Sequence, residues 1–175
     1  MDAYWTRDPA DVSVNEICRL AGVSKPSLYR DFGNEDGLTR ATLQRYAEQV
    51  LSDVFAILQA GRGLHWTLDA LMDFAADDPR MERGCVFYKM RNGKHRLGPE
   101  TRALVEELDA AARAAYAEAL RAGRQAGEWV PGPTDEVGGR YLSEQIGLAI
   151  TQRASGEDSR QVRESLSLAL SVFRR

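Results

Sequence analysis

Two short helices joined by a tight turn form the most restrictive pattern in this 175-residue chain. The first helix is predicted to begin at Ser13, because the Ser13 hydroxyl and the Glu16 carboxylate have the spacing of a capping box. Gly22 is expected to end this helix. Ser24 then caps the second helix, in which Pro26 lies in the first turn and needs no amide hydrogen. Two capped helices around such a turn predict a helix-turn-helix.

Helical periodicity continues through the rest of the chain. A third helix is predicted to begin after Asn34, a good capping residue, and to run to about Ala60. Further helices are expected at about 64–76, 84–91, 100–126, 134–154 and 158–173. No segment alternates apolar and polar residues as a half-buried strand does. We therefore predict an all-α protein, in which a long helix joins a short head (residues 1–46) to a helical body (residues 47–175).

Composition narrows the class of protein. The chain is 43% hydrophobic and 28% charged, which is typical of folded globular domains. Its start lacks the apolar segment of a secretory signal, and no apolar run has the length of a membrane span, so we expect a cytoplasmic protein. Cys18 and Cys85 lie far apart without histidines at ligand spacing, so neither a disulfide framework nor a metal site is expected. No convergent set of acid, base and nucleophile indicates an enzyme or a cofactor site.

The second helix of the head begins with side chains that could contact DNA. Ser24, Lys25 and Ser27 gather there, where free backbone amides also favour a phosphate. Lysine reaches guanine acceptors, and serine can contact any base. The overall charge opposes this interpretation, because residues 1–48 hold six basic and eight acidic side chains, a net charge of −2. Attraction to phosphates normally supplies most of the non-specific affinity for DNA.

The run SVNEICRLAGVSKPSLYRDFGNEDGLTRATL resembles the DNA-binding segment of TetR-type repressors. The shared pattern is a capped helix, then Ala-Gly-Val-Ser, then a recognition helix ending in Leu-Tyr-x-x-Phe, then a helix that starts with an acidic residue and contains leucine. The matching residues are Ala21, Gly22, Val23, Ser24, Leu28, Tyr29, Phe32 and Leu38. The motif covers about a sixth of the chain. It implies a helix-turn-helix head on a ligand-binding and dimerisation body.

The resemblance also implies a role for individual residues. The residues expected to contact DNA are Ser13, Asn15, Ser24, Lys25, Ser27, Tyr29 and Arg30. Among them Tyr29 would contact a phosphate through its hydroxyl, whereas Ser27 and Arg30 would face base edges. Val23, Leu28 and Phe32 are expected to lie in the core of the head.

Two departures from the family pattern concern the head. Family members usually carry a lysine where this chain has Glu35, which would repel a phosphate. They also begin with a full helix, whereas only Asp2–Arg7 precedes the first break here. A helix of that length is marginal alone and is expected to bury little. We interpret Tyr4 and Trp5 as the end of a longer helix. In that interpretation Met1 is a misplaced or alternative translation start.

The body offers candidates for a small-molecule site. Aromatic and methionine side chains line adaptable apolar pockets, although each alone is more often ordinary core. The candidate ligand-binding residues are Trp66, Phe74, Phe87, Tyr88, Met90 and Tyr116. Nothing in this set specifies the ligand.

Two further features of the body have a plain and a functional interpretation. Cys85 follows Gly84 at the start of a short helix, where it is either a reactive sensor or, as is commoner, a buried thiol. The segment from Arg83 to Arg96 contains five basic side chains and no acid. It is interpreted first as a solvated loop, and second as a site for an acidic ligand or a contact that relays ligand binding to the head.

The last two helices carry the pattern of a dimer interface. Small residues recur every fourth position of the penultimate helix, which lets another helix approach closely, and leucines line the last helix. The candidate dimerisation residues are Gly139, Ser143, Gly147, Leu166 and Leu170. A four-helix interface between two copies is expected, with packing inside one chain as the alternative.

These observations predict a homodimeric repressor that binds double-stranded operator DNA. Its two heads would enter successive major grooves of a pseudo-palindrome, and a small-molecule effector would favour a head spacing that no longer fits. The alternative is a TetR-like ligand-sensing dimer with weak or lost independent DNA binding, as the acidic head, Glu35 and the short start all favour.

Overall fold

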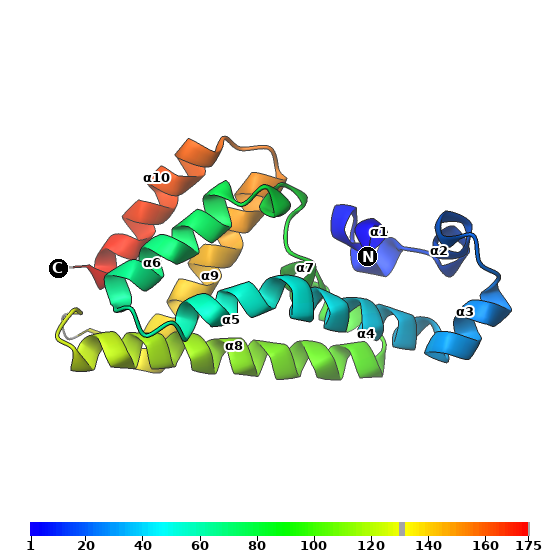
Figure 1. The fold of residues 1–175 in the computed structure, drawn as a ribbon, viewed down its shortest axis with the longest axis horizontal. Helices are drawn as coiled ribbons and strands as arrows, with labels where there is room; N and C mark the ends of the chain where they lie inside the picture. The colour runs from blue at the N-terminus through cyan, green and yellow to red at the C-terminus, as the bar shows by residue number, and fades with distance from the viewer. Residues whose placement is uncertain (130–131, 175) are drawn as a thin grey trace. The chain divides into compact units, whose positions relative to one another are not determined.

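The computed structural model describes residues 1–129 and 132–174, and within these residues every regular element is helical (Figure 1). The main helices are α1 (Asp2–Thr6), α2 (Val14–Ala21), α3 (Lys25–Phe32), α4 (Glu35–Tyr46), α5 (Ser52–Leu58), α6 (Leu64–Met72), α7 (Val86–Asn92), α8 (Pro99–Gln125), α9 (Asp135–Ala154) and α10 (Ser159–Leu170). Shorter turns are η1 (Pro9–Asp11), η2 (Ala47–Leu51), η3 (Asp73–Asp77), η4 (Pro79–Arg83), η5 (Lys94–Arg96) and η6 (Ser171–Phe173). The all-α prediction is confirmed. None of the helices described is long and apolar enough to cross a membrane.

The predicted third helix is present as an uninterrupted run of three elements. Helix α4 leads into η2, a wider π-type turn, and η2 leads directly into α5 (Figure 1). A π-type turn accommodates one extra residue without ending the helix. The expected end near Ala60 agrees with the end of α5 at Leu58.

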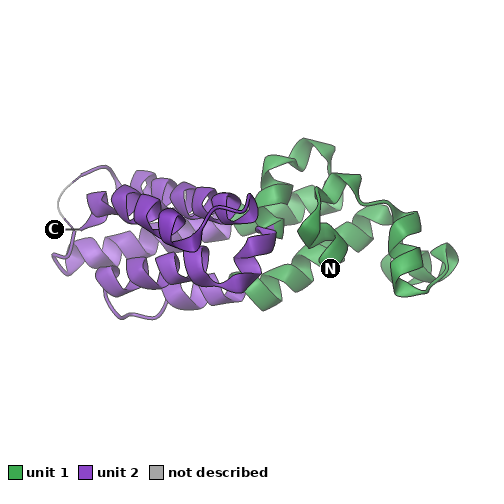
Figure 2. Ribbon diagram, turned by 90° about the horizontal axis from the view of Figure 1, so that it is seen from above, with its two compact units in different colours: residues 1–51, 86–109 green, residues 52–85, 110–175 purple. Residues whose placement is uncertain are grey.

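The chain divides into two compact units (Figure 2). Unit 1 contains Met1–Leu51 and Val86–Asp109, and unit 2 contains Ser52–Cys85 and Ala110–Arg175. The predicted boundary at residue 46 therefore lies near the end of the first segment of unit 1, but that unit also includes α7 and the first turns of α8. The sequence analysis assigned those later residues to the body.

The head of unit 1 has its own small core. Val14 of α2, Leu28 of α3 and Leu38 of α4 are buried together, and Ile17 and Cys18 pack against them. The spacing of these apolar residues puts one side of each short helix toward the other two. The three helices therefore form a packed head of the kind that the sequence pattern predicts.

Helix α1 is short but well packed, contrary to the expectation that it buries little. Tyr4 and Trp5 are only 2% and 6% exposed. The Trp5 ring meets the edge of Tyr46 at a centroid distance of 5.3 Å, and the Tyr4 hydroxyl lies 3.4 Å from the Thr39 hydroxyl. Burial is the largest influence on the Tyr4 phenol and raises its pKa. Two aromatic side chains thus anchor five residues of helix.

In unit 2, close packing of helices depends on small residues. A Cβ added to Gly139 of α9 would lie 2.7 Å from the Ala117 backbone nitrogen of α8, which is too close for any side chain. Helix α10 packs along α9 and α6 (Figure 1). The Trp129 ring lies 5.4 Å from the Phe173 ring and below the Arg124 guanidinium, so the ends of this bundle are also filled.

Candidate DNA-binding interface and effector hollow

The turn between α2 and α3 forms through the capping residues that the sequence indicates. The Ser13 hydroxyl oxygen accepts a hydrogen bond from the Glu16 amide at 3.3 Å, and the Ser24 hydroxyl oxygen accepts one from the Ser27 amide at the same distance. Gly22 has a φ of +66°, a conformation that side chains disfavour. The Glu16 carboxylate pairs with Arg7 at 2.5 Å rather than completing a capping box.

The recognition helix α3 presents most of the predicted DNA contacts to solvent. Ser24, Lys25, Tyr29 and Arg30 are exposed, and Ser27 is half-buried. The first turn of α3 also offers backbone amides, which favour an anion. This face can therefore bring hydroxyls, an ammonium group and a phenol to a DNA backbone at the same time.

Arg30 is held by its neighbours in the absence of DNA. Its guanidinium donates to the Asp31 carboxylate at 3.3 Å and to the Ser27 hydroxyl at 3.1 Å. Both groups are exposed, so the pairing is weak and can be exchanged. To contact a base edge, Arg30 would have to leave Asp31.

Ser13 and Asn15, the two predicted contacts from α2, are also exposed. Ser13 already accepts the capping hydrogen bond, but a hydroxyl can donate its hydrogen to a phosphate at the same time. Thus all seven predicted DNA contacts lie in the helix-turn-helix, and six of them are exposed.

Two of the three predicted core residues of the head lie at the surface. Leu28 is 4% exposed, whereas Val23 and Phe32 are each 41% exposed, and Leu20 beside them is 60% exposed. The expectation for Val23 and Phe32 is therefore wrong. One buried residue from each of α2, α3 and α4 forms the core of the head. The connection between α2 and α3 and the C-terminal end of α3 therefore lie at the edge of this core.

Several acids of the head are neutralised within unit 1. Arg96 pairs with Asp8 at 2.8 Å and with Asp11 at 2.5 Å. Asp36 is hydrogen-bonded to the first turn of α8. The negative charge counted from the sequence therefore overstates the repulsion that a phosphate would meet, although Glu35 stays exposed.

The basic segment before α8 makes contacts and is not simply a solvated loop. Lys94 pairs with Glu106 at 3.1 Å, Arg91 pairs with Asp109 at 3.2 Å, and Arg96 reaches η1. Cys85 is 5% exposed, which fits the interpretation as a buried thiol.

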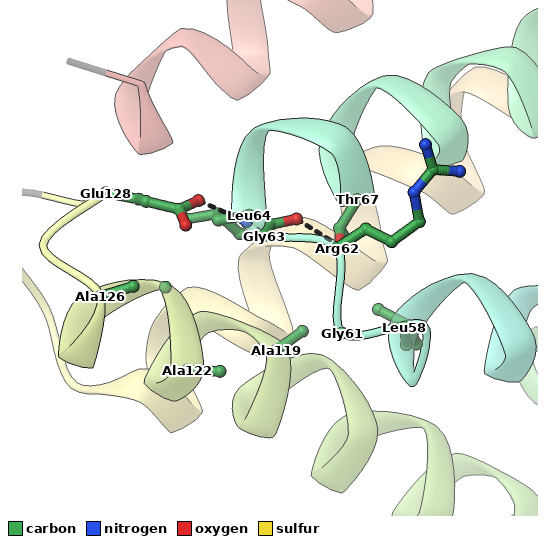
Figure 3. A pocket seen from close by; sticks show the side chains of 11 residues that line it. Leu58, Gly61, Arg62, Gly63, Leu64, Thr67, Ala119, Ala122, Ala126 and Glu128 are labelled. Carbon is green, nitrogen blue, oxygen red and sulfur yellow. Dashed lines mark hydrogen bonds between the residues drawn. The ribbon is translucent and has the colours of Figure 1, made fainter.

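Unit 2 contains a half-open hollow of about 230 Å³ between the turn before α6 and the last turns of α8 (Figure 3). The Glu128 carboxylate lies at one end and accepts a hydrogen bond from the Leu64 amide at 2.5 Å. Figure 3 shows the Arg62 side chain turned away from the space. The α8 side is lined by small residues: Ala119, Ala122, Gly123 and Ala126. Because these residues are small, the space between the helices is not filled.

The six predicted ligand-binding residues do not line this hollow. They are divided between the units: Trp66, Phe74 and Tyr116 in unit 2, and Phe87, Tyr88 and Met90 in unit 1. All but Trp66 and Tyr88 are buried, as core residues are. Trp66 is covered by Arg62, whose guanidinium lies 4.3 Å from the ring centroid, and Arg91 lies 4.8 Å from the Tyr88 ring.

The predicted dimerisation residues are packed inside unit 2. Gly139 touches α8, and Ser143, Gly147, Leu166 and Leu170 are all buried. Their burial within one chain agrees with the alternative that the sequence left open, packing inside the chain, and at Gly139 the neighbouring helix is α8. Helices α9 and α10 and the η6 turn that follows them expose other large apolar side chains, with 39–76% of each accessible: Val137, Tyr141, Leu148, Leu168 and Val172.

Comparisons with known proteins agree with the head and with the fold. The family model of the bacterial regulatory proteins of the tetR family matches residues 2–42. A curated relative, the HTH-type transcriptional regulator AlkX of Mycobacterium tuberculosis, is 32% identical over 62 residues, which are 35% of this chain and 29% of that protein. An uncharacterised HTH-type regulator of the same species, MT1294, is 24% identical over 82 residues, 45% of this chain and 41% of that protein. The chain thus matches less than half the length of these relatives.

Solved structures share the whole fold. A TetR-family regulator from Agrobacterium tumefaciens superposes with a TM-score of 0.85 at 14% identity, covering 99% of this chain and 94% of that one. The regulator CifR, as a cysteine mutant complexed with a 26-bp operator, gives 0.81 at 20% identity, covering 98% and 91%. A regulator from Saccharomonospora viridis in complex with choline gives 0.75 at 18% identity, covering 97% and 92%.

Proposed function

We propose that the chain is a repressor of the TetR family, because its head matches the tetR family model and its fold is shared by solved TetR-family regulators. It binds a pseudo-palindromic operator as a homodimer and releases it when a small molecule binds. It acts in the cytoplasm. This family and this fold are those of transcription regulators rather than of enzymes.

The exposed face of α3 is the observation that supports this proposal. Lys25 and the free amides of the first turn bind a phosphate, and the Tyr29 hydroxyl donates to another. Arg30 exchanges Asp31 for the O6 and N7 atoms of a guanine, the commonest specific contact of arginine in the major groove. Two copies of α3 then read two half-sites, about 34 Å apart or a multiple of that.

The test begins with a duplex selected by the protein from a randomised library. Tyr29→Phe should weaken binding to all sequences alike, because the lost contact is to a phosphate. Arg30→Ala should relax preference at one base position at a loss of about 1–3 kcal/mol. Arg45→Ala removes the same charge from the far end of α4 and serves as the control. Unchanged selection by Arg30→Ala would contradict the assigned role.

Glu35 favours one alternative, a ligand-sensing dimer that binds DNA weakly by itself. Its carboxylate is exposed at the start of α4, with two residues between it and the end of α3. A gel-shift titration at low salt distinguishes the two, because phosphate attraction is strongest there. The duplex for this comparison is selected with Glu35→Lys. If that variant binds the duplex and the wild-type chain does not, the alternative is correct.

The effector site is proposed at the hollow beside Glu128. A carboxylate among small apolar residues suits a small organic cation, and choline is the ligand in the complex from Saccharomonospora viridis. Choline is therefore the first probe. Saturating choline should raise the unfolding temperature of the wild-type chain, as any ligand of the folded state does. Ala122→Leu, which fills the hollow, should abolish the rise, and Ala103→Leu on the exposed side of α8 should not.

The dimer is proposed to form through the exposed apolar side chains of α9 and α10. Leu168 is 76% exposed and Val172 is 61% exposed, and Leu148 of the neighbouring helix is 53% exposed. The Tyr141 hydroxyl donates to the Ala169 carbonyl at 3.4 Å, which joins the two helices. Exposed large apolar side chains on two adjacent helices and on the η6 turn that follows them are typical of surfaces that a partner covers.

A further inference from the structure

The first turn of α8 lacks a cap from its own sequence. The residue before Pro99 is Gly98, whose carbonyl accepts the helical hydrogen bond from Arg102 at 3.0 Å but which has no side chain to cap the helix. The amides of Glu100 and Thr101 therefore need an acceptor from elsewhere, because the first amides of any helix have no partner inside it. The missing cap makes this end of α8 dependent on another segment.

Asp36 of α4 supplies the missing cap. Its carboxylate accepts hydrogen bonds from the Glu100 amide at 2.8 Å, from the Thr101 amide at 3.1 Å and from the Thr101 hydroxyl at 2.5 Å. The Thr101 hydroxyl also lies 3.1 Å from the Asp36 carbonyl oxygen. Thr101 is fully buried. A carboxylate at a helix N-terminus gains from both the hydrogen bonds and the helix dipole.

The absence of a side chain at Gly98 is required by this contact. A Cβ at that position would lie 2.2 Å from the Asp36 carboxyl carbon and 2.5 Å from its oxygens, closer than real Cβ contacts allow. The same glycine that leaves α8 uncapped thus makes room for the carboxylate that caps it.

Two more contacts join the same parts of unit 1. Arg96 pairs with Asp8 and Asp11 of the segment around η1. The Lys89 ammonium donates to the carbonyl oxygen of Trp5 in α1. Residues 89–101 therefore hold the head at α1, at η1 and at the start of α4.

We propose that Asp36 is a positioning residue that latches the reading head to the first turn of α8. This proposal rests on the proposed function, because it assumes that α3 binds DNA. It adds that the latch holds the recognition helix in position before the protein binds DNA. Helix α3 ends at Phe32 and α4 begins at Glu35, so only Gly33 and Asn34 separate α3 from the helix that carries Asp36. A shift of the first turn of α8 carries α3 with it. An unlatched head has to be ordered on DNA, which weakens binding.

The latch is tested from both of its sides by operator binding and amide hydrogen exchange. Asp36→Ala removes the acceptor, and Glu35→Ala is the matched control, because it removes an adjacent exposed carboxylate. Thr101→Val removes only the hydroxyl from a buried side chain. Asp36→Asn keeps only one acceptor oxygen, because both carboxylate oxygens accept hydrogen bonds, Oδ2 from Glu100 and Oδ1 from Thr101. Thr101→Ser keeps the hydroxyl and is the conservative variant.

We expect exchange at the Glu100 and Thr101 amides to rise about tenfold or more in Asp36→Ala, the loss typical of a hydrogen bond to a charged group. Operator affinity should fall about fivefold relative to Glu35→Ala, which corrects for the removed charge, and by a similar factor in Thr101→Val relative to wild type. Thr101→Ser should stay near wild type, whereas Asp36→Asn should lie between wild type and Asp36→Ala, because it keeps one of the two acceptor oxygens. The effects of Asp36→Ala and Thr101→Val should not add, because both break one contact.

Each result decides a different point. If operator affinity in Asp36→Ala equals that in Glu35→Ala, or rises above it, the latch is refuted while the proposed function stands. If exchange at the two amides is unchanged, the cap itself is refuted. If the wild-type chain selects no duplex, the proposed function fails and the regulatory role of the latch fails with it, whereas the exchange data still report whether Asp36 caps α8.

Discussion

Replacing Trp5 with alanine tests whether five residues of α1 can anchor the head. Trp5 is 6% exposed and packs edge-to-face on Tyr46 at 5.3 Å and 89°. Removing a buried tryptophan costs about 3–5 kcal/mol, which includes the cavity left behind. The aromatic pair contributes about 0.5–1.5 kcal/mol of that beyond the area it buries. Because whole domains are stable by only about 5–15 kcal/mol, this is a large fraction of the total.

Urea unfolding followed by far-ultraviolet circular dichroism measures the change. Trp5→Phe should cost much less than Trp5→Ala, because it keeps a ring against Tyr46. Trp66→Ala is the control, since Trp66 is half-buried in unit 2, where the Arg62 guanidinium lies over its ring. Exchange at the amides of α4 shows whether the loss is local to the head. If Trp5→Ala unfolds within about 1 kcal/mol of wild type, the packing argument for α1 is wrong.

Three further predictions concern the dimer, the latch and the hollow. Leu168→Glu should convert a dimer into a monomer in light scattering, because it puts a charge into the apolar face, whereas Leu20→Glu makes the same change on the head and should leave the dimer intact. For Asp36, burial raises the pKa, but hydrogen bonds from Thr101 and from the amides of α8 outweigh it and leave the pKa below its usual 3.8. Because the Asp36 pKa is lower in the folded than in the unfolded protein, the carboxylate stabilises the fold at pH values above its unfolded pKa, and this stability is lost as pH falls through its folded pKa. Protection of the Thr101 amide should therefore be constant from about pH 5 to 8 and fall only below 3.8. Choline should lower operator affinity in wild type but not in Ala122→Leu, and equal effects in both would place the effector elsewhere.

The sequence predicts the helix-turn-helix well because its signals are local. A cap is decided within three residues, so Ser13, Gly22 and Ser24 can be assigned from their neighbours alone. Tyr4 and Trp5 were interpreted as the end of a helix for similar reasons. Their burial depends on α4, where Trp5 packs on Tyr46 and the Tyr4 hydroxyl lies near Thr39, 35 positions later, and local spacing carries no information about these partners.

The positions that the sequence analysis misplaced all depend on packing between distant segments. Val23 and Phe32 have the spacing of core residues, but spacing does not reveal which sides of a head are covered. The stripe at Gly139 permits a close approach by any helix, and α8 of the same chain takes that place. Asp36 lies in the first turn of α4, where an acidic residue is explained by the helix start alone. Its actual partners, Glu100 and Thr101, lie 64 and 65 positions later, so the local sequence does not predict them.

The pairing of Arg30 with Asp31 and Ser27 affects how the protein would search a chromosome. A guanidinium that its neighbours already hold adds little attraction for the phosphates of an arbitrary sequence, so Lys25 dominates the encounter with unselected DNA. Within the major groove, a guanine can replace both hydrogen bonds through its O6 and N7 atoms, so Arg30 leaves Asp31 most readily there. Sliding over wrong sequences would therefore stay fast, and the choice of site would be made in a late step, after the head has already entered the groove.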